Sequence, residues 1–213
     1  MGGPGQSGAG WTVSERRLLD RLTDPARIQG FLDRIPYSAD HFYRCPRRVI
    51  RDRKAHCFDG AVFAAAALRR IGHPPLLLDM RAVRDDDHII ALFHRDGLTG
   101  AVAKSNFVGL RYREPIFRTV RELVLSYFED FYNLAREKTL RAYSLALDLS
   151  RFDALEWETR DDGLEVIASR LDTIRHFPLL SGRQAARLAP VERRLFAAGL
   201  SGANWKGLYK PRG

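Results

Sequence analysis

One cysteine of this chain stands where a thiol can act as a nucleophile. Residues 53–72 predict a helix, because small and apolar side chains recur there at three- and four-residue steps. Cys57 falls in the first turn, beside backbone N–H groups that have no partner within the helix. The helix dipole is expected to lower the pKa of the Cys57 thiol, and these N–H groups suit a developing oxyanion. Free cysteines are often buried and inert, so the thiol alone does not specify a chemistry.

A histidine and a polar segment follow Cys57 in the order that a thiol-dependent triad requires. His88 opens an apolar run that predicts a strand, and residues 100–106 predict the next strand, after a typical hairpin turn at residues 96–97. A thiol, a base and an orienting group brought together in this way can perform acyl transfer. We therefore interpret Cys57 as a candidate nucleophile and His88 as a candidate general base.

The register of this hairpin decides which residue would orient the imidazole. A two-residue loop at 96–97 places His88 opposite Ser105, and one extra loop residue moves the partner to Lys104 or Asn106. A side-chain amide can accept a hydrogen bond from imidazole and hold its tautomer, whereas a hydroxyl orients it weakly and an ammonium cannot accept. We predict Asn106 as the third member of the triad, with Ser105 as the alternative.

A basic stretch precedes the helix and could influence the site. Residues 36–55 predict a loop that carries many cations and two aspartates: Arg44, Arg47, Arg48, Arg51, Arg53 and Lys54 against Asp40 and Asp52. These charges either form a solvated surface or favour the thiolate and attract an anionic substrate. On the second interpretation, Arg53, His56 and Ser105 are candidate substrate-binding residues.

The same residues carry a resemblance to a known family. Cys57-Phe-Asp-Gly-Ala61, Leu68-Arg-Arg-Ile-Gly72 and the later His88 resemble the core of the transglutaminase-like superfamily, over about residues 45–110. The segment 110–123 resembles bacterial members of unassigned function. The resemblance implies a papain-like Cys-His-Asp/Asn triad and a thiol hydrolase or acyltransferase. The expected third strand carries no aspartate, and the alternative is therefore a non-catalytic peptide- or protein-binding module that retains this fold.

Composition and charge exclude several other classes. The chain has 213 residues, of which 45% are hydrophobic, so it can form a core and is not of disordered composition. The net charge of +9 suggests nucleic-acid binding, but the cations are scattered and no zinc-finger, leucine-zipper or RNA-recognition pattern occurs. We therefore expect a peptide, protein or small amide or acyl substrate rather than a nucleic acid. The run Asp85-Asp86-Asp87 matches no zinc spacing, and we predict neither a metal nor a cofactor.

The predicted location follows from what the sequence lacks. No apolar run is long enough to span a bilayer, and the first ten residues have no basic and apolar parts of a secretory signal. Two cysteines, Cys45 and Cys57, do not make a disulfide framework. We predict a cytoplasmic protein that does not enter a membrane.

Together these elements predict an α+β fold. A cysteine-bearing central helix is expected to pack on a small antiparallel sheet, with flanking N- and C-terminal helices. The expected strands are 75–83, 88–93, 100–106 and part of 138–149. The expected flanking helices begin near Thr12 or Ser14, at Pro25, at Glu114 (ending near 131), at Leu164 and after Pro190. We divide the chain into a flexible lead (1–10), one domain with a helical C-terminal extension (11–200) and a basic tail (201–213).

Overall fold

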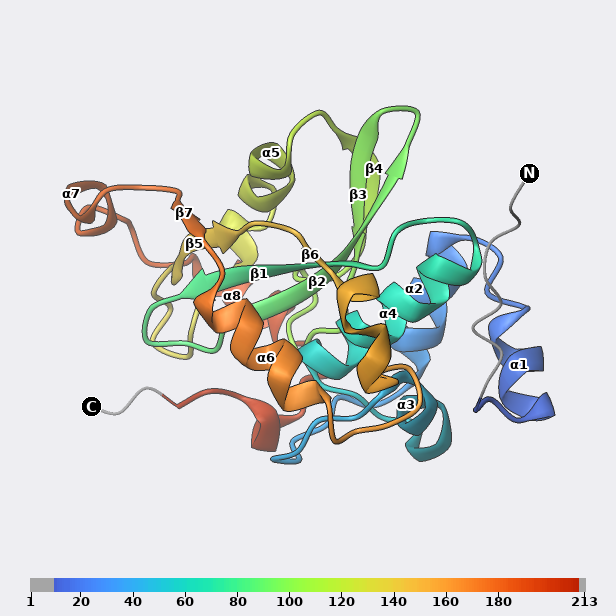
Figure 1. Ribbon diagram of the computed structural model, residues 1–213. Helices are drawn as coiled ribbons and strands as arrows, with labels where there is room; N and C mark the ends of the chain where they lie inside the picture. Colours follow the sequence, from blue (N-terminus) through green and yellow to red (C-terminus); the bar gives the residue numbers. More distant parts are fainter. Residues whose placement is uncertain (1–9, 211–213) are drawn as a thin grey trace.

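A seven-stranded antiparallel sheet with helices on both faces organises the protein (Figure 1). The computed structural model describes residues 10–210, so nearly all of the predicted lead and the last three residues of the predicted tail lie outside the described part. The helices are α1 Val13–Leu19, α2 Pro25–Arg34, α3 Pro46–Asp52, α4 Cys57–Arg70, α5 Val120–Leu125, α6 Leu164–Thr173, α7 Gly182–Ala185 and α8 Arg193–Gly199. The strands are β1 Leu76–Ala82, β2 His88–Arg95, β3 Leu98–Val102, β4 Arg113–Phe117, β5 Leu140–Ser144, β6 Leu147–Asp148 and β7 His176–Pro178. The predicted α+β class is confirmed.

The two faces of the sheet pack against different layers, as the alternation of side chains along a strand requires. The strand order is β4-β3-β2-β1-β5-β7, with β6 paired to β1. One face packs against α4 and α2 through residues that include Leu77, Ile89, Ala91, Phe93 and Val102. The opposite face packs against α5 and the segment after it, through residues that include Leu78, Met80, Ile90 and Leu92.

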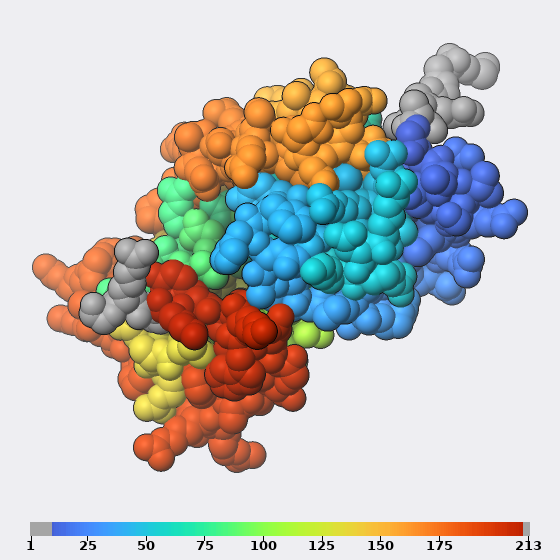
Figure 2. Space-filling view, turned by 90° about the horizontal axis from the view of Figure 1, so that it is seen from below, coloured from blue at the N-terminus to red at the C-terminus, as the bar shows by residue number. Residues whose placement is uncertain are grey.

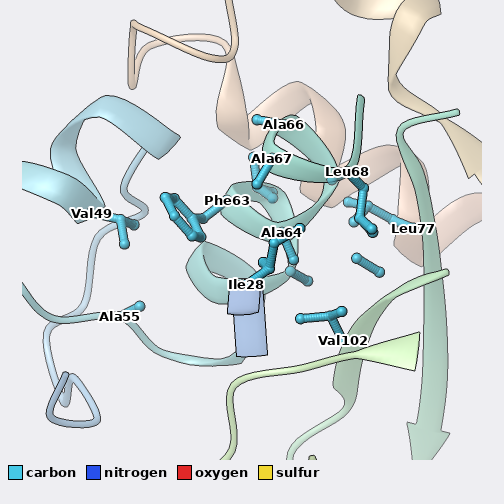
Figure 3. Close-up of a cluster of buried hydrophobic side chains, with 14 of the residues drawn as sticks. Ile28, Val49, Ala55, Phe63, Ala64, Ala66, Ala67, Leu68, Leu77 and Val102 are labelled. Carbon is cyan, nitrogen blue, oxygen red and sulfur yellow. The ribbon is translucent and has the colours of Figure 1, made fainter. Parts of the chain in front are cut away.

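The central helix α4 is the most buried element. Its alanines and Phe63 contact residues of α2, α3, β1 and β3, as the close-up shows (Figure 3). The N-cap is His56: its Nδ1 accepts from the backbone N–H of Asp59, whose carboxylate accepts from the His56 N–H in return. Gly72 follows the helix end with φ of +93°, a conformation that suits glycine. The predicted helix is therefore confirmed, and it begins at Cys57.

Glycine lets the first turn of α4 approach the chain that follows β3. A Cβ atom at Gly60 would collide with the Lys104 side chain. Lys104 is itself fixed, because its ammonium donates to the carbonyl of Leu32 at 2.8 Å and to that of Ile35. These contacts hold the Cys57 end of the helix near residues 103–106.

The hairpin predicted around residues 96–97 is present. Asp96 and Gly97 both have positive φ, at 53° and 76°, as a two-residue turn of this kind needs. β2 and β3 pair from Arg95↔Leu98 to Ala91↔Val102, where the pairing stops. The predicted third strand is therefore shorter than expected, and it ends before Ser105 and Asn106.

Two predicted elements were wrong. In place of the long helix expected from Glu114, the structure has an edge strand, β4, followed by the short helix α5. Proline is tolerated on an edge strand. The capping box formed by Thr119 and Glu122 sets the start of α5. The loop expected over residues 36–55 contains α3, which begins with Pro46 in the first helical position. Within residues 10–210, no helix combines the length and apolar composition that a bilayer crossing needs.

Candidate active site

A cavity of about 490 Å³ lies at the N-terminal end of α4. Cys57 and His88 line it, together with parts of four segments: residues 37–43, 85–89, 168–172 and 206–209. These four segments, blue, green, orange and red, come together on the face of the molecule seen in Figure 2. The predicted thiol and the predicted base thus line one cavity, although their hydrogen bonds go to the carbonyls of Asp87 and Leu110 and not to each other.

Cys57 is the first residue of α4 and is half-buried. Its thiol donates to the backbone carbonyl of Asp87, with Sγ 3.8 Å from the oxygen. The β2–β3 pairing ends at Ala91↔Val102, so the start of β2 has no β3 partner. The thiol is thus held against the backbone of the residue that precedes His88.

His88 is buried at the start of β2, with its ring against Phe131. Its Nε2 lies 2.9 Å from the backbone carbonyl of Leu110. A carbonyl can only accept, so in the neutral ring Nε2 carries the proton and Nδ1 carries the free lone pair. The Leu110 carbonyl therefore selects the tautomer in which Nδ1 can receive a proton.

The resting thiol and imidazole are both uncharged. Burial raises the pKa of the Cys57 thiol to about 12, and the carboxylates of Asp86 and Asp59 add to the increase. Burial lowers the pKa of His88 to about 4, against the hydrogen bond to Leu110. The expectation that the helix dipole lowers the Cys57 pKa was wrong, because loss of solvent outweighs the dipole here. A neutral imidazole near pH 7 can nevertheless act as a general base.

The low pKa of His88 predicts a pH dependence of stability. The unfolded chain takes up a proton near the ordinary value of 6.5, whereas folded His88 resists protonation until about pH 4. The contribution of His88 to the free energy of unfolding is therefore fully present above pH 6.5. It falls by about 2–3 kcal/mol as the pH falls toward 4. Urea unfolding of wild type and His88→Gln at several pH values measures this difference, and parallel pH profiles would contradict it.

The predicted third member has other partners in this structure. Asn106 donates from Nδ2 to the Asn204 carbonyl and accepts on Oδ1 from the Asn204 N–H, both at 2.8 Å. Ser105 accepts from the backbone N–H of Phe107. Both residues line the cavity, but the group bonded to His88 is the Leu110 carbonyl. Asn106 holds the C-terminal segment that forms one wall of the cavity.

Contacts with α2 explain why residues 103–106 do not continue the pairing of β3 with β2. The backbone of Ala103 exchanges two hydrogen bonds with the Gln29 side chain on α2, at 2.9 and 3.0 Å. The Lys104 ammonium binds the last carbonyls of the same helix. These contacts turn residues 103–106 away from β2 and toward α2.

None of the six cations in the basic stretch before α4 lines this cavity. Arg44 is 1% exposed and bonds to Asp40, Asp52 and the Ser38 hydroxyl, while its backbone N–H donates to Asp59. Lys54 pairs with Asp40. Arg53 ends α3 in a left-handed conformation with its guanidinium over Phe31, and it does not line the cavity. Because these cations pair with other groups and do not line the cavity, the structure favours the interpretation of this stretch as a charged surface.

His56 lines the cavity, but its role is to begin the helix. Burial and the nearby Arg44 lower the pKa of His56 to about 4, so it is neutral at pH 7. Its Nδ1 is the acceptor for the Asp59 N–H at 3.4 Å. His56 therefore stands beside the thiol as an uncharged cap.

Two groups at the site had no signal in the sequence. The Leu110 carbonyl is a backbone atom, which no residue pattern reveals. Tyr37 bridges to Ala55 and lines the cavity, and its pKa is raised well above the ordinary value by burial, with further effects from Cys57. The phenol is thus uncharged at pH 7 and lines the same cavity as the thiol.

Comparisons with known proteins give only partial likenesses. No family model matches the chain, and no curated protein matches it. Three solved structures of LapG from Legionella pneumophila are similar, at 18%, 16% and 17% identity and TM-scores of 0.34, 0.33 and 0.40. They cover 41%, 42% and 69% of this chain; the second is described as calcium-bound and the third as EGTA-treated. The chain spans 59% of LapG in the first two and 87% in the third. We base the functional proposal on the geometry of this chain.

Proposed function

We propose that this protein is a cysteine-dependent acyl-transfer or amide-hydrolysing enzyme, in which Cys57 is the nucleophile and His88 the general base. One observation carries the proposal: the Cys57 thiol at the start of α4 and the neutral His88, with Nδ1 left as acceptor, line one cavity. The resemblance of the residues around them to the transglutaminase-like superfamily supports the same chemistry.

The reaction starts from a thiol and a neutral imidazole. Nδ1 of His88 takes the thiol proton while the sulfur forms a bond to the substrate carbonyl carbon, whose π electrons move to oxygen. The tetrahedral intermediate then collapses, the bond to the leaving amine breaks, and His88 returns the proton to that amine. Water or a second amine then attacks the thioester carbonyl while His88 takes its proton. The C–S bond breaks, the acid or new amide is released, and His88 returns the proton to the Cys57 sulfur. Leu110 is a positioning residue, because its carbonyl keeps Nε2 protonated throughout.

Two donors are available for the oxyanion of this intermediate. The backbone N–H of Cys57 is free of an intrahelical partner in the first turn of α4. The Tyr37 side chain lines the same cavity, and its phenol O–H can donate a hydrogen bond. An oxyanion formed on a carbonyl attacked by Cys57 would therefore meet both groups.

Tyr37→Phe is expected to lower the turnover by about 10²-fold, the usual effect of removing one oxyanion donor. The ring and its packing against Gly207 are kept, so KM and unfolding free energy should change little. Steady-state kinetics of the two proteins measure the effect. A higher KM with unchanged turnover would show that the phenol binds the substrate rather than the oxyanion.

The proposed chemistry is tested with a small, neutral activated ester. Incubation with p-nitrophenyl acetate should release nitrophenolate in a burst and leave an acetyl group on Cys57, located by peptide mass mapping. Added amine should then receive the acetyl group in competition with water. Cys45 is buried and serves as the internal control. Acetylation at neither cysteine, or equally at both, would contradict the proposal.

A second candidate is a non-catalytic peptide- or protein-binding module. The raised pKa of the Cys57 thiol favours it, since a resting thiol of this kind is a poor nucleophile without help from a base. A binding module would keep the cavity and bind peptide without forming any acyl-enzyme. The same ester experiment separates the two functions.

A further inference from the structure

We propose that the Cys57 cavity selects substrates that carry a positive charge close to the carbonyl that is attacked, such as basic peptides or amine-bearing amides. This inference rests on the proposed function, since it names the substrate class of that site. It follows from the charges that line the cavity, from their partners and from the other groups in the lining.

The cavity has an acidic wall. Asp85, Asp86 and Asp87 precede β2 on one side, and Asp172 at the end of α6 lies on another. Asp86 and Asp172 are exposed, and neither forms an ion pair within residues 10–210. Asp85 receives a hydrogen bond from the Thr139 hydroxyl, and Asp87 receives one from the Ala82 N–H and lies 3.9 Å from Arg81. Two carboxylates of the wall thus remain available to a cation.

The cations that line the cavity do not balance this wall. Lys206 is the one lysine or arginine among the lining residues of the described chain. Asp40, the fifth aspartate of the lining, already pairs with Arg44 and Lys54. His56 and His88 are neutral at pH 7, because burial lowers both pKa values to about 4. The site is therefore acidic near pH 7 although the chain carries a net charge of +9. Burial raises the pKa values of Asp85, Asp86 and Asp87, that of Asp85 to about 6, which is still below pH 7.

Other groups in the lining fit the same ligand. Tyr37, Tyr43 and Tyr209 line the cavity, and aromatic rings attract organic cations. His88 is 4% exposed, lines the cavity, and has no recorded partner for Nδ1 within residues 10–210. A lone pair kept at this depth points to a ligand that delivers its reacting group beside the thiol, with its charge toward the acidic wall.

A bound cation would also favour catalysis. Asp86 is one of the carboxylates that hold the Cys57 pKa high. A positive charge near Asp86 would offset that effect and make the thiol easier to deprotonate. Substrate binding and activation of the nucleophile would then be coupled.

The charge selection can be measured without any turnover. Trimethylammonioethyl and sulfonatoethyl methanethiosulfonate have opposite charges. The same thiolate attacks both, forms a disulfide and releases methanesulfinate, so the Cys57 pKa cancels from the ratio of the two rates. The ratio of the cationic to the anionic rate at Cys57 is divided by the same ratio for 2-mercaptoethanol, which corrects for the intrinsic reactivity of the two reagents. We expect this corrected ratio to be at least about ten. Peptide mass mapping assigns the modified cysteine.

Two variants test the origin of the preference. Asp86→Asn combined with Asp172→Asn should lower the corrected ratio at least about threefold. Asp96→Asn is the matched control: Asp96 is exposed and unpaired in the described chain, lies at the far end of β2, and has a positive φ that asparagine tolerates. A corrected ratio of one or less, no reaction at Cys57, or an unchanged ratio in the double variant would overturn the inference.

The result separates this inference from the proposed function. A preference for the cationic reagent without an acetyl-enzyme would support an acidic binding cavity and contradict the proposed enzymatic function. An acetyl-enzyme without a preference for the cationic reagent would support the enzymatic function and contradict the proposed substrate class. Acylation by p-nitrophenyl esters of acetylated arginine and of its neutral isostere citrulline then repeats the comparison with a reacting substrate, and equal rates would count against the inference.

Discussion

Cys57→Ala is expected to abolish acetyl-enzyme formation and to lower turnover by about 10⁴-fold or more, because no other group can form the thioester. The loss should appear in turnover rather than in folding. Cys57 is the first residue of α4, where alanine is well tolerated, and its side chain is only half-buried. Hydrolysis of p-nitrophenyl acetate, with the unfolding free energy measured in parallel, checks both parts.

Two further cysteine variants test whether the loss is specific to the Cys57 thiol. Cys57→Ser keeps a hydroxyl of similar size beside His88 and should also lose most activity, since an alcohol is much harder to deprotonate than a thiol. Cys45→Ser changes the other cysteine, whose pKa burial raises to about 12 and which does not line the cavity. A Cys57→Ala protein that keeps more than about a tenth of the turnover would refute the assigned nucleophile.

Arg44→Ala should be the most destabilising single substitution near the site, at about 3–5 kcal/mol. Its guanidinium is almost fully buried and bonds to Asp40, Asp52 and Ser38, with Asp59 3.6 Å away. Asp59 is fully buried, and that burial raises its pKa to about 7. Removing the arginine therefore leaves a buried carboxylate beside the N-cap of α4 without its nearest cation. Urea unfolding near pH 7 measures the loss.

Matched variants identify the cause. Arg160→Ala removes an exposed arginine that pairs with Asp162, and it should change the unfolding free energy little. Arg44→Ala combined with Asp59→Asn should recover part of the stability, since the carboxylate without a partner is then gone. A cost for Arg44→Ala no larger than that of Arg160→Ala would show that the buried ion pairs contribute little.

Local patterns predicted the elements that carry the thiol and the base. The apolar spacing and the alanine run specify α4, and Asp96-Gly97 specifies the hairpin turn, because each depends on residues close in sequence. The edge strand β4 was missed because Glu114-Pro115 also resembles a helix start. The Thr119/Glu122 capping box was the signal that separates the two.

The details of the site depended on contacts between distant segments. Gln29 and α2 draw residues 103–106 away from β2, so the hairpin register could not be extended to Asn106. The group that orients His88 is a backbone carbonyl, and the pKa of Cys57 depends on burial by several elements. The sequence left the role of the basic stretch open for the same reason, because Asp59, which approaches Arg44, lies on α4.

The alkylation rate of Cys57 in wild type and in His88→Gln tests most directly whether His88 takes the thiol proton. Iodoacetamide is neutral and small, and Cys45 reports within each sample on any general loosening of the fold. We predict that Cys57 near pH 7 reacts about 10²-fold faster in the wild type, and that this advantage disappears as the pH falls toward 4. Equal rates at Cys57 in the two proteins, over the whole pH range, would contradict the account.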